Sequence, residues 1–256
     1  MAHSIPFRRQ QTRGEDQSEG AALRATHPED LSEEQRRVLA DYWRGRGVGE
    51  MGAERYFARV VSDLRALDAA PGLIDCAIAA TEDERRHGLW GRDWALFFGH
   101  TETSDPVATR TKELVFPGAS ARENSILRIA FCAFLESVGC HVLAVVRPRI
   151  GYAPLLENNR VHLSDEVRHA RVGWAFLSTL HADDRLVVSR FLPLLLRLLP
   201  KAVCEGSESD QYDALVPFGY LTPSVLWQGH AEALRELIHP GLLHMGISAH
   251  NLAGAA

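Results

Sequence analysis

Two copies of one pentapeptide are the residues of this chain best suited to metal chemistry. Asp83-Glu84-Arg85-Arg86-His87 returns 82 residues later as Asp165-Glu166-Val167-Arg168-His169. On a helix that advances about 100° per residue, Glu and His three positions apart lie about 60° from each other, so one face presents a carboxylate oxygen and an imidazole nitrogen together. Two such helices that face each other form a two-metal site. The repeat therefore predicts Glu84, His87, Glu166 and His169 as metal ligands.

A two-metal site of this kind takes one further carboxylate from each of two additional helices in a four-helix bundle. The segment 126–143 between the repeats is almost wholly apolar, and Glu136 is its only carboxylate. A lone buried carboxylate is costly unless it is paired or bound to a metal. Glu136 is therefore predicted as the ligand from the third helix.

The first helix offers two carboxylates one turn apart, Glu50 and Glu54, of which the site needs one. Glu50 is followed by the small residue Ala53 at +3 and by the aromatic Phe57 at +7. This spacing resembles the first ligand helix of ferritins, rubrerythrins and the demethoxyubiquinone hydroxylases. We predict Glu50 as the ligand on this basis.

Glu54 remains the alternative. It stands 82 residues before Glu136, the offset of the repeat, and a tight turn at 68–72 would set it level with the first pentapeptide. A looser connection from about Leu64 would restore Glu50. If Glu54 is not a ligand, we expect it to support the site or to line its cavity.

A third histidine, His162, stands four residues before Glu166 on the same helical stripe as His169. With this residue the chain resembles the p-aminobenzoate N-oxygenase family, whose di-iron site carries an additional His one turn before the final Glu-x-x-His. The resemblance covers about residues 45–185. The spacings of 34 from Glu50 to Glu84, 49 from His87 to Glu136 and 26 from Glu136 to His162 fit the family's layout.

The resemblance implies an all-α, ferritin-like four-helix bundle with additional N- and C-terminal helices. It implies two iron ions (Fe²⁺/Fe³⁺) as cofactor, O₂ as co-substrate and an unidentified electron donor. The implied activity is N-oxygenation of an amine in a small-molecule, secondary-metabolite precursor through a peroxo di-iron intermediate. The predicted ligands are Glu50, Glu84, His87, Glu136, His162, Glu166 and His169.

Other functions remain open at this point. The ligand types alone suit iron, zinc or manganese, and bridging carboxylates in a bundle favour a pair of iron or manganese ions. One alternative is a di-iron hydroxylase or desaturase that acts on carbon, which only His162 separates from an N-oxygenase. The other is a non-enzymatic ferritin-like iron-binding protein.

The pentapeptides also contain residues that could support the ligands. Metal-bound imidazoles usually donate their other N–H to a carboxylate, and an Asp beside a ligand Glu can reach a histidine across the bundle. We predict this role for Asp83 and Asp165, with Arg86 and Arg168. The alternative is surface Asp–Arg pairing along each helix.

The remaining histidines are not predicted as ligands. Glu236 and His239 form a third Glu-x-x-His just before Pro240, with no partner Glu at bundle spacing, and we interpret them as a helix terminus with a cationic cap. The others are expected to be packing or surface residues: His141, His181, His230 and His244.

The composition sets limits on the class of protein. A chain of 256 residues that is 46 % apolar can bury a full core, and we expect one ferritin-like domain at 29–256 after a mobile N-terminal tail at 1–28. A net charge of −5 without a long Lys/Arg cluster favours small molecules or a second copy, in a possible homodimer, over nucleic acid. No signal peptide or membrane span is indicated, so a cytoplasmic location is expected. The four cysteines are interpreted as buried thiols in a reducing compartment: Cys76, Cys132, Cys140 and Cys204.

Helical signals dominate from Pro28 onward, and strand signals are scarce. Ser32 followed by acidic residues predicts a helix start, and the polar stretch 99–121 is expected to be the long crossover of the bundle. The last two helices are expected to pack outside the bundle and to close the substrate cavity. The predicted helices are 32–43, 50–65, 71–98, 122–146, 158–181, 184–203 and 222–239.

Overall fold

The computed structural model describes residues 27–108, 113–199 and 210–247. Residues 1–26 of the predicted mobile tail lie outside the described residues, and so does Cys204. The described residues are helical and contain no strand, which confirms the all-α prediction. The α-helices are α1 Glu33–Ala66, α2 Pro71–Phe97, α3 Ala121–Val146, α4 Ala153–Thr179, α5 Ala182–Leu198, α6 Pro223–Ala233 and α7 His239–His244. Shorter helices are η1 Pro28–Asp30, η2 Arg147–Arg149, η3 Asp210–Phe218 and the π-helix η4 Leu234–Ile238.

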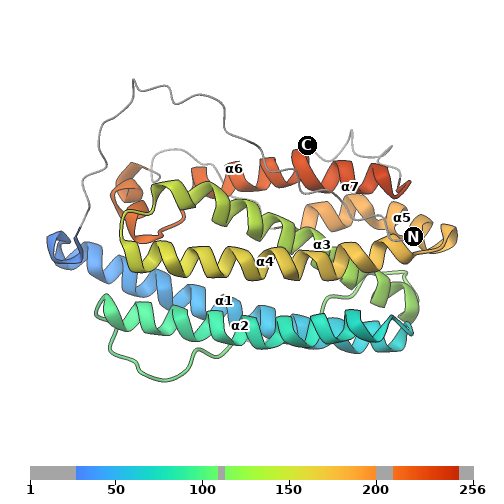
Figure 1. Cartoon of the computed structure of the whole chain (residues 1–256), viewed down its shortest axis with the longest axis horizontal. Helices are drawn as coiled ribbons and strands as arrows, with labels where there is room; N and C mark the ends of the chain where they lie inside the picture. Colours follow the sequence, from blue (N-terminus) through green and yellow to red (C-terminus); the bar gives the residue numbers. More distant parts are fainter. Residues whose placement is uncertain (1–26, 109–112, 200–209, 248–256) are drawn as a thin grey trace.

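The four long helices pack in a ring in which each has two neighbours. α1 packs against α2 and α3, and α4 packs against the same two helices from the other side. α5 and α6 pack on α3, and in Figure 1 α6 and α7 form the upper edge of the molecule while α1 and α2 form the lower edge. The described parts of the 99–121 segment are not helical until Ala121, as predicted for a long crossover. The polar faces of four helices can therefore meet in the middle of the ring.

Local signals account for the starts of two long helices. Ser32 and Ser120 each close a capping box, in which the serine hydroxyl accepts from the backbone N–H three residues on, and the Gln35 or Glu123 side chain accepts from the serine N–H. These reciprocal bonds satisfy N–H groups that have no partner within the helix. The predicted start at Ser32 is therefore confirmed.

The prediction of separate helices at 32–43 and 50–65 was wrong, because α1 is one continuous helix through Gly45, Gly47 and Gly49. The reason is tertiary packing. A Cβ on Gly47 would lie 2.8 Å from the Gly88 carbonyl oxygen, and a Cβ on Gly91 would lie 2.6 Å from the Gly47 Cα. The glycines thus let α1 and α2 approach at backbone distance, and this packing outweighs the poor helix propensity of glycine.

Two other helix limits differ from the prediction. α4 begins at Ala153 rather than at 158, because Pro154 occupies the first turn of the helix, where its missing N–H costs nothing. The last helix continues past 239 to His244, so Glu236 and His239 do not form a helix terminus. The π-helix Leu234–Ile238 ends two residues before Pro240, and its wider turn accommodates the proline ring within a continuing helix.

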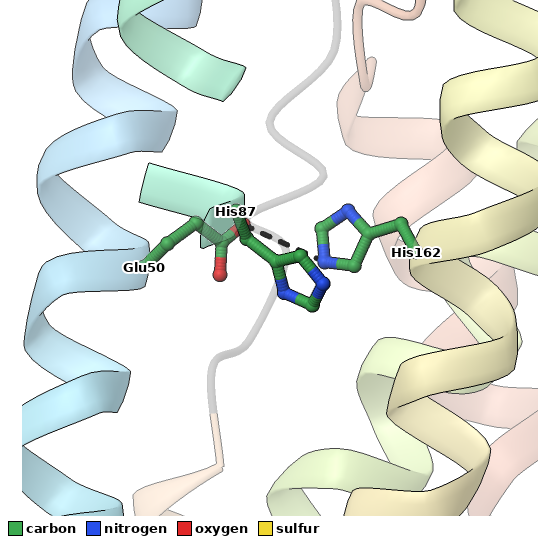
Figure 2. A group of neighbouring side chains, drawn as sticks. All are labelled: Glu50, His87 and His162. Carbon is green, nitrogen blue, oxygen red and sulfur yellow. Dashed lines mark ion pairs between the residues drawn. The ribbon is translucent and has the colours of Figure 1, made fainter. Parts of the chain in front are cut away.

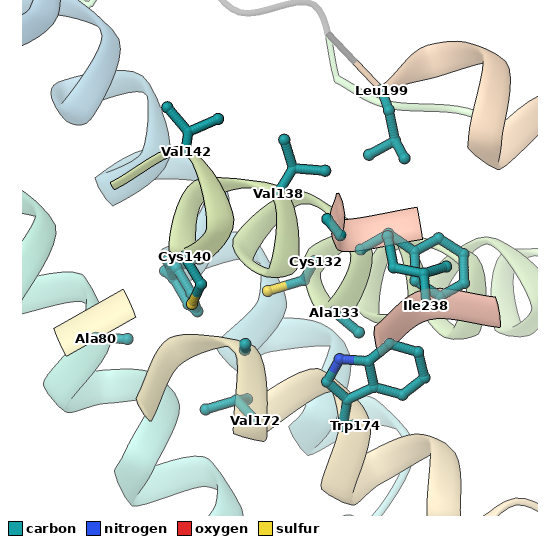
Figure 3. Close-up of a cluster of buried hydrophobic side chains, with 14 of the residues drawn as sticks. Ala80, Cys132, Ala133, Val138, Cys140, Val142, Val172, Trp174, Leu199 and Ile238 are labelled. Atoms are coloured by element: carbon teal, nitrogen blue, oxygen red, sulfur yellow. The ribbon is translucent and has the colours of Figure 1, made fainter. Parts of the chain in front are cut away.

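α3 is the most deeply buried helix. A Cβ on Gly173 of α4 would lie 2.6 Å from Ala133, and a Cβ on Gly229 of α6 would lie 2.6 Å from Val142, so two helices meet the α3 backbone closely. Figure 3 shows Ala133 and Val142 of α3 within a cluster of buried apolar side chains that also contains Cys132 and Cys140 of the same helix. The stretch Ala121–Arg149 is long and apolar enough to span a membrane. However, 67 % of its most apolar 18 residues are buried inside the protein, as in the core helix of a soluble protein.

Candidate metal centre

The four long helices bring all seven predicted ligands together in two adjoining groups. The first group contains Glu50 of α1, His87 of α2 and His162 of α4 (Figure 2). The second contains Glu84 of α2, Glu136 of α3, and Glu166 and His169 of α4, and within each group one ligand atom per residue lies within 4.8 Å of the others. Six of the seven residues are buried. Among the described residues, this cluster of Glu and His could hold a metal ion.

The two pentapeptides support each other across the interface of α2 and α4. The Nε2 atom of His87 lies 3.0 Å from the Asp165 carboxylate, and the Nε2 atom of His169 lies 3.3 Å from the Asp83 carboxylate. Burial opposes ionisation of both aspartates, but hydrogen bonds from Arg86 and Arg168 and from the histidines outweigh it and lower their pKa. An ionised carboxylate can only accept a hydrogen bond, so each histidine is assigned its hydrogen on Nε2.

This arrangement leaves the Nδ1 atom of each pentapeptide histidine directed at the carboxylates. His87 Nδ1 and His169 Nδ1 are buried and have no hydrogen-bond partner, although His169 Nδ1 lies 2.9 Å from Glu84 Oε1. Glu84 Oε2 is likewise buried without a donor. Buried polar atoms are nearly always paired in folded proteins, so an unpaired cluster of two lone pairs and a carboxylate oxygen fits a bound cation.

Glu84 and Glu166 belong to the second group and also lie close to histidines of the first group. Glu84 Oε2 is 3.6 Å from His87 Nδ1, while its other oxygen faces His169. Glu166 Oε1 is 3.0 Å from His162 Nε2 and 3.7 Å from His87 Nδ1, while Oε2 is 3.9 Å from His169 Nδ1. Each of these two carboxylates therefore offers one oxygen to each group.

The structure places Glu50 in the cluster and leaves Glu54 outside both groups. The turn between α1 and α2 is tight, which is the condition under which Glu54 was the alternative ligand. The rotation of α1 about its axis nevertheless directs Glu50, and not Glu54, toward the cluster. Ala53 lines the cavity beside Glu50, and the Phe57 ring lies 5.1 Å from the His169 ring, so positions 50, 53 and 57 form the inward face. Glu54 is rotated about 100° from Ala53.

Arg46 is a site residue that the sequence reasoning missed. Its guanidinium lies 2.7 Å from Glu50 Oε1, one helical turn away on the same face. Burial opposes ionisation of Glu50, but the charges of Arg46, His162 and His87 together outweigh it and lower the pKa of that carboxyl. The sequence contained an indication of this contact, because Arg and Glu four residues apart on a helix commonly form an ion pair.

The remaining carboxylates crowd negative charge into a buried space. Burial, with the charge of Glu166, raises the pKa of Glu84 and of Glu136 well above their usual range. Burial, with the charge of His162, lowers the pKa of His87 to about 4. Hydrogen bonding and charge from His162 lower the pKa of Glu166 although burial opposes this. The four carboxylates of the cluster match the charge of two divalent cations, which would remove the crowding.

A cavity of about 330 Å³ adjoins the cluster. Glu50, Glu84, Glu136 and Glu166 form part of its wall together with His162 and Arg46. The rest of the wall is apolar or small: Ala53, Leu135, Val138, Gly139, Val142, Leu143, Leu221 and Leu226. A Cβ on Gly139 would lie 3.3 Å from Glu166 Oε2, so the glycine leaves room for that carboxylate. Of the helices predicted to close the cavity, α6 contributes Leu226 to its wall, whereas no residue of α5 lines it.

Several predicted assignments fall outside the cluster. Glu236 is exposed and pairs with Arg235, and His239 is exposed, so the third Glu-x-x-His has no place in the site. Cys76 is exposed, which contradicts its prediction as a buried thiol, while Cys132 and Cys140 are buried. None of the other histidines joins either group: His141, His181, His230 and His244.

Comparisons with protein-family models, with curated proteins and with solved structures gave no match. The all-helical arrangement and the buried Glu/His cluster are therefore the features from which a function is inferred.

Proposed function

We propose that the protein is an O₂-dependent, non-haem di-iron oxygenase with a ferritin-like bundle, and that it N-oxygenates an amine of a small-molecule precursor. The observation that carries the proposal is that five residues of the two adjoining donor groups, with Arg46, line a cavity whose remaining wall is apolar or small. A site that only stores iron has no use for an apolar cavity at its ligands, whereas an enzyme places its substrate there. Two iron ions, when bound, supply the electrons that activate O₂ beside the substrate.

The protein's own residues set the conditions for this chemistry. Asp83 and Asp165 hold the Nε2–H of the two pentapeptide histidines, so that both Nδ1 atoms face inward. Arg46 holds Glu50 on the cavity side. The leucine and valine side chains of the wall exclude water from the substrate, which strengthens polar interactions inside the site.

His162 supports the choice of an amine as the substrate group. It adds a third imidazole to the cluster, 3.0 Å from Glu166 and beside the His87 ring, whose centroid lies 3.9 Å from its own. A neutral nitrogen donor in place of an oxygen donor makes the metal centre richer in electrons. By the resemblance to the p-aminobenzoate N-oxygenases, such a centre favours attack on nitrogen.

The test is a single turnover with labelled oxygen. Protein expressed with iron is analysed for metal, reduced without air, and mixed with ¹⁸O₂ and a panel of aromatic and aliphatic amines, and products are identified by mass spectrometry. We expect about two iron ions per chain and an ¹⁸O-labelled nitrogen product. Glu136→Ala should bind little iron and form no product, while His162→Ala should keep most of its iron and lose most of the product. Label on carbon would establish a hydroxylase instead, and iron oxidation without any oxygenated product would establish an iron-binding protein.

A further inference from the structure

Trp43 and Asn159 each bury one hydrogen-bonding atom that no group in the described protein satisfies. The atoms are Trp43 Nε1, which carries a hydrogen and can only donate, and Asn159 Oδ1, which can only accept. Both residues line a second, small cavity of about 20 Å³, together with Arg46 and His162. The two residues that hold an unpaired donor and an unpaired acceptor thus line one small space, whose wall also includes His162 of the candidate metal centre.

The surroundings hold both atoms in place. The Trp43 ring packs edge-on against Tyr42 at 5.5 Å and tilted against Trp94 at 6.2 Å, and Gly219 leaves space for it, because a Cβ there would lie 2.9 Å from the ring. The Asn159 amide is oriented by its Nδ2, which donates to the Leu143 carbonyl at 3.3 Å. The donor and the acceptor are therefore oriented before any ligand arrives.

The size and polarity of the cavity define what can bind. One water-sized group needs a cavity of about 10–15 Å³, so a cavity of about 20 Å³ accepts one such group and not two. The group must accept from an indole N–H and donate to an amide oxygen. A hydroxyl group does both, whereas a carboxylate cannot donate and an ammonium cannot accept.

The position of the small cavity connects it to the larger one. The two cavities share Arg46, Leu143, His162 and Leu221 in their walls, so they lie side by side. We propose that Trp43 and Asn159 form a hydroxyl-binding subsite at the edge of the metal centre, filled by ordered water or by a hydroxyl group of the substrate. Occupation by a substrate hydroxyl rests on the proposed function, because that proposal assigns the larger cavity to a substrate. The existence of the hydroxyl-binding subsite does not rest on it.

The experiment combines crystallography and calorimetry on the full-length protein, with two probes that need neither an amine nor turnover. Benzyl alcohol and toluene differ only in the hydroxyl group. Trp43→Phe keeps the aromatic volume and removes the N–H, and Asn159→Leu removes the acceptor in case the first variant is unstable. Trp174→Phe is the matched control, because the Trp174 Nε1 already donates to Ser137 Oγ at 2.9 Å and Trp174 lines neither cavity.

We expect a peak of electron density within hydrogen-bonding distance of both atoms in the wild type and in Trp174→Phe, and no ordered peak in Trp43→Phe or Asn159→Leu. If the substrate supplies the group, benzyl alcohol binds about tenfold more tightly than toluene, as a difference near 1.4 kcal/mol requires, and Trp43→Phe removes the preference. If water supplies it, the peak persists with both probes and their affinities are equal. A wild-type structure without the peak, or a peak that survives both substitutions, overturns the subsite. Iron content is measured on the same preparations, so failure of the di-iron proposal is seen separately.

Discussion

Replacing Asp165 with alanine should weaken metal binding far more than it weakens the fold. The Asp165 carboxylate accepts from His87 Nε2 at 3.0 Å, and it also binds Arg86 at 2.7 Å and Arg168 at 2.6 Å. Without it, His87 loses the group that fixes its hydrogen on Nε2 and its Nδ1 toward the cluster. Loss of such a partner typically lowers metal affinity about 10- to 100-fold, which corresponds to about 1.4–2.7 kcal/mol.

The stability cost of the same substitution is expected to be smaller. Arg86 and Arg168 have exposed fractions of 42 % and 53 %, so water can hydrate the nitrogens that Asp165 releases. Both arginines also retain their ion pairs with the Asp83 carboxylate, at 2.7 Å for Arg86 and 2.9 Å for Arg168. Ion pairs that are half open to solvent contribute about 1 kcal/mol or less, so we expect a decrease of that size in the free energy of unfolding of the metal-free protein.

Titration of Fe²⁺ without air, in competition with a coloured chelator, measures the affinity, and urea denaturation measures the stability. Asp165→Asn is the control, because the amide oxygen can still accept from His87 and should preserve most of the affinity. Asp83→Ala should cost less than Asp165→Ala, since its bond to His169 is longer, at 3.3 Å. The reasoning is refuted if Asp165→Ala binds iron as tightly as the wild type while the fold is intact.

Three further outcomes are expected. Gly91→Ala should lower the free energy of unfolding by about 1–3 kcal/mol, because its Cβ would lie 2.6 Å from the α1 backbone, whereas Gly45→Ala, with nothing within 4 Å, should raise it by up to about 1 kcal/mol; urea titrations of both variants check this. Glu236→Ala should leave the iron content at the wild-type value in metal analysis, since Glu236 lies outside the cluster. Hydrogen bonds from Arg122 lower the pKa of Asp184, so its stabilisation is present above the unfolded pKa, about 3.9, and is lost as the pH falls through the lower folded value. Asp184→Asn should therefore be less stable than the wild type by about 0.5–1 kcal/mol at pH 7, and unfolding measured at falling pH should show this difference disappear in acid.

Part of the molecule could be predicted from the sequence because it depends on residues at most four positions apart. The spacing of Glu and His in the two pentapeptides sets their common helix face whatever the rest of the chain does. The limits of α2 and α3 lie within about two residues of those predicted, since proline and capping residues act locally. The lone Glu136 in an apolar helix indicated by its burial cost alone that it must face other polar groups.

Other features depend on how the helices meet, and only the tertiary structure decided them. The sequence predicted a break at the glycines between 45 and 49, because it could not show that Gly47 meets α2 at backbone distance. The choice of Glu50 over Glu54 followed from the rotation of α1. The buried ion pair of Asp63 with Arg128, at 2.6 Å between α1 and α3, was likewise not predicted, although the single arginine of the apolar segment 126–143 calls for a carboxylate partner.

The physical reason is that helical periodicity is local to one segment, whereas contacts between helices depend on the whole fold. A helical period is a property of one segment, so the sequence by itself determined which side chains share a face and that seven of them could bind metal. Which faces meet depends on the distance and rotation at which two helices pack, and these are set by the few positions, such as Gly47, Gly91 and Gly173, where backbones touch. The tertiary structure therefore decided which carboxylate of α1 joins the site, which aspartate holds which histidine, and that Trp43 and Asn159, far apart in the chain, line one cavity beside the metal centre.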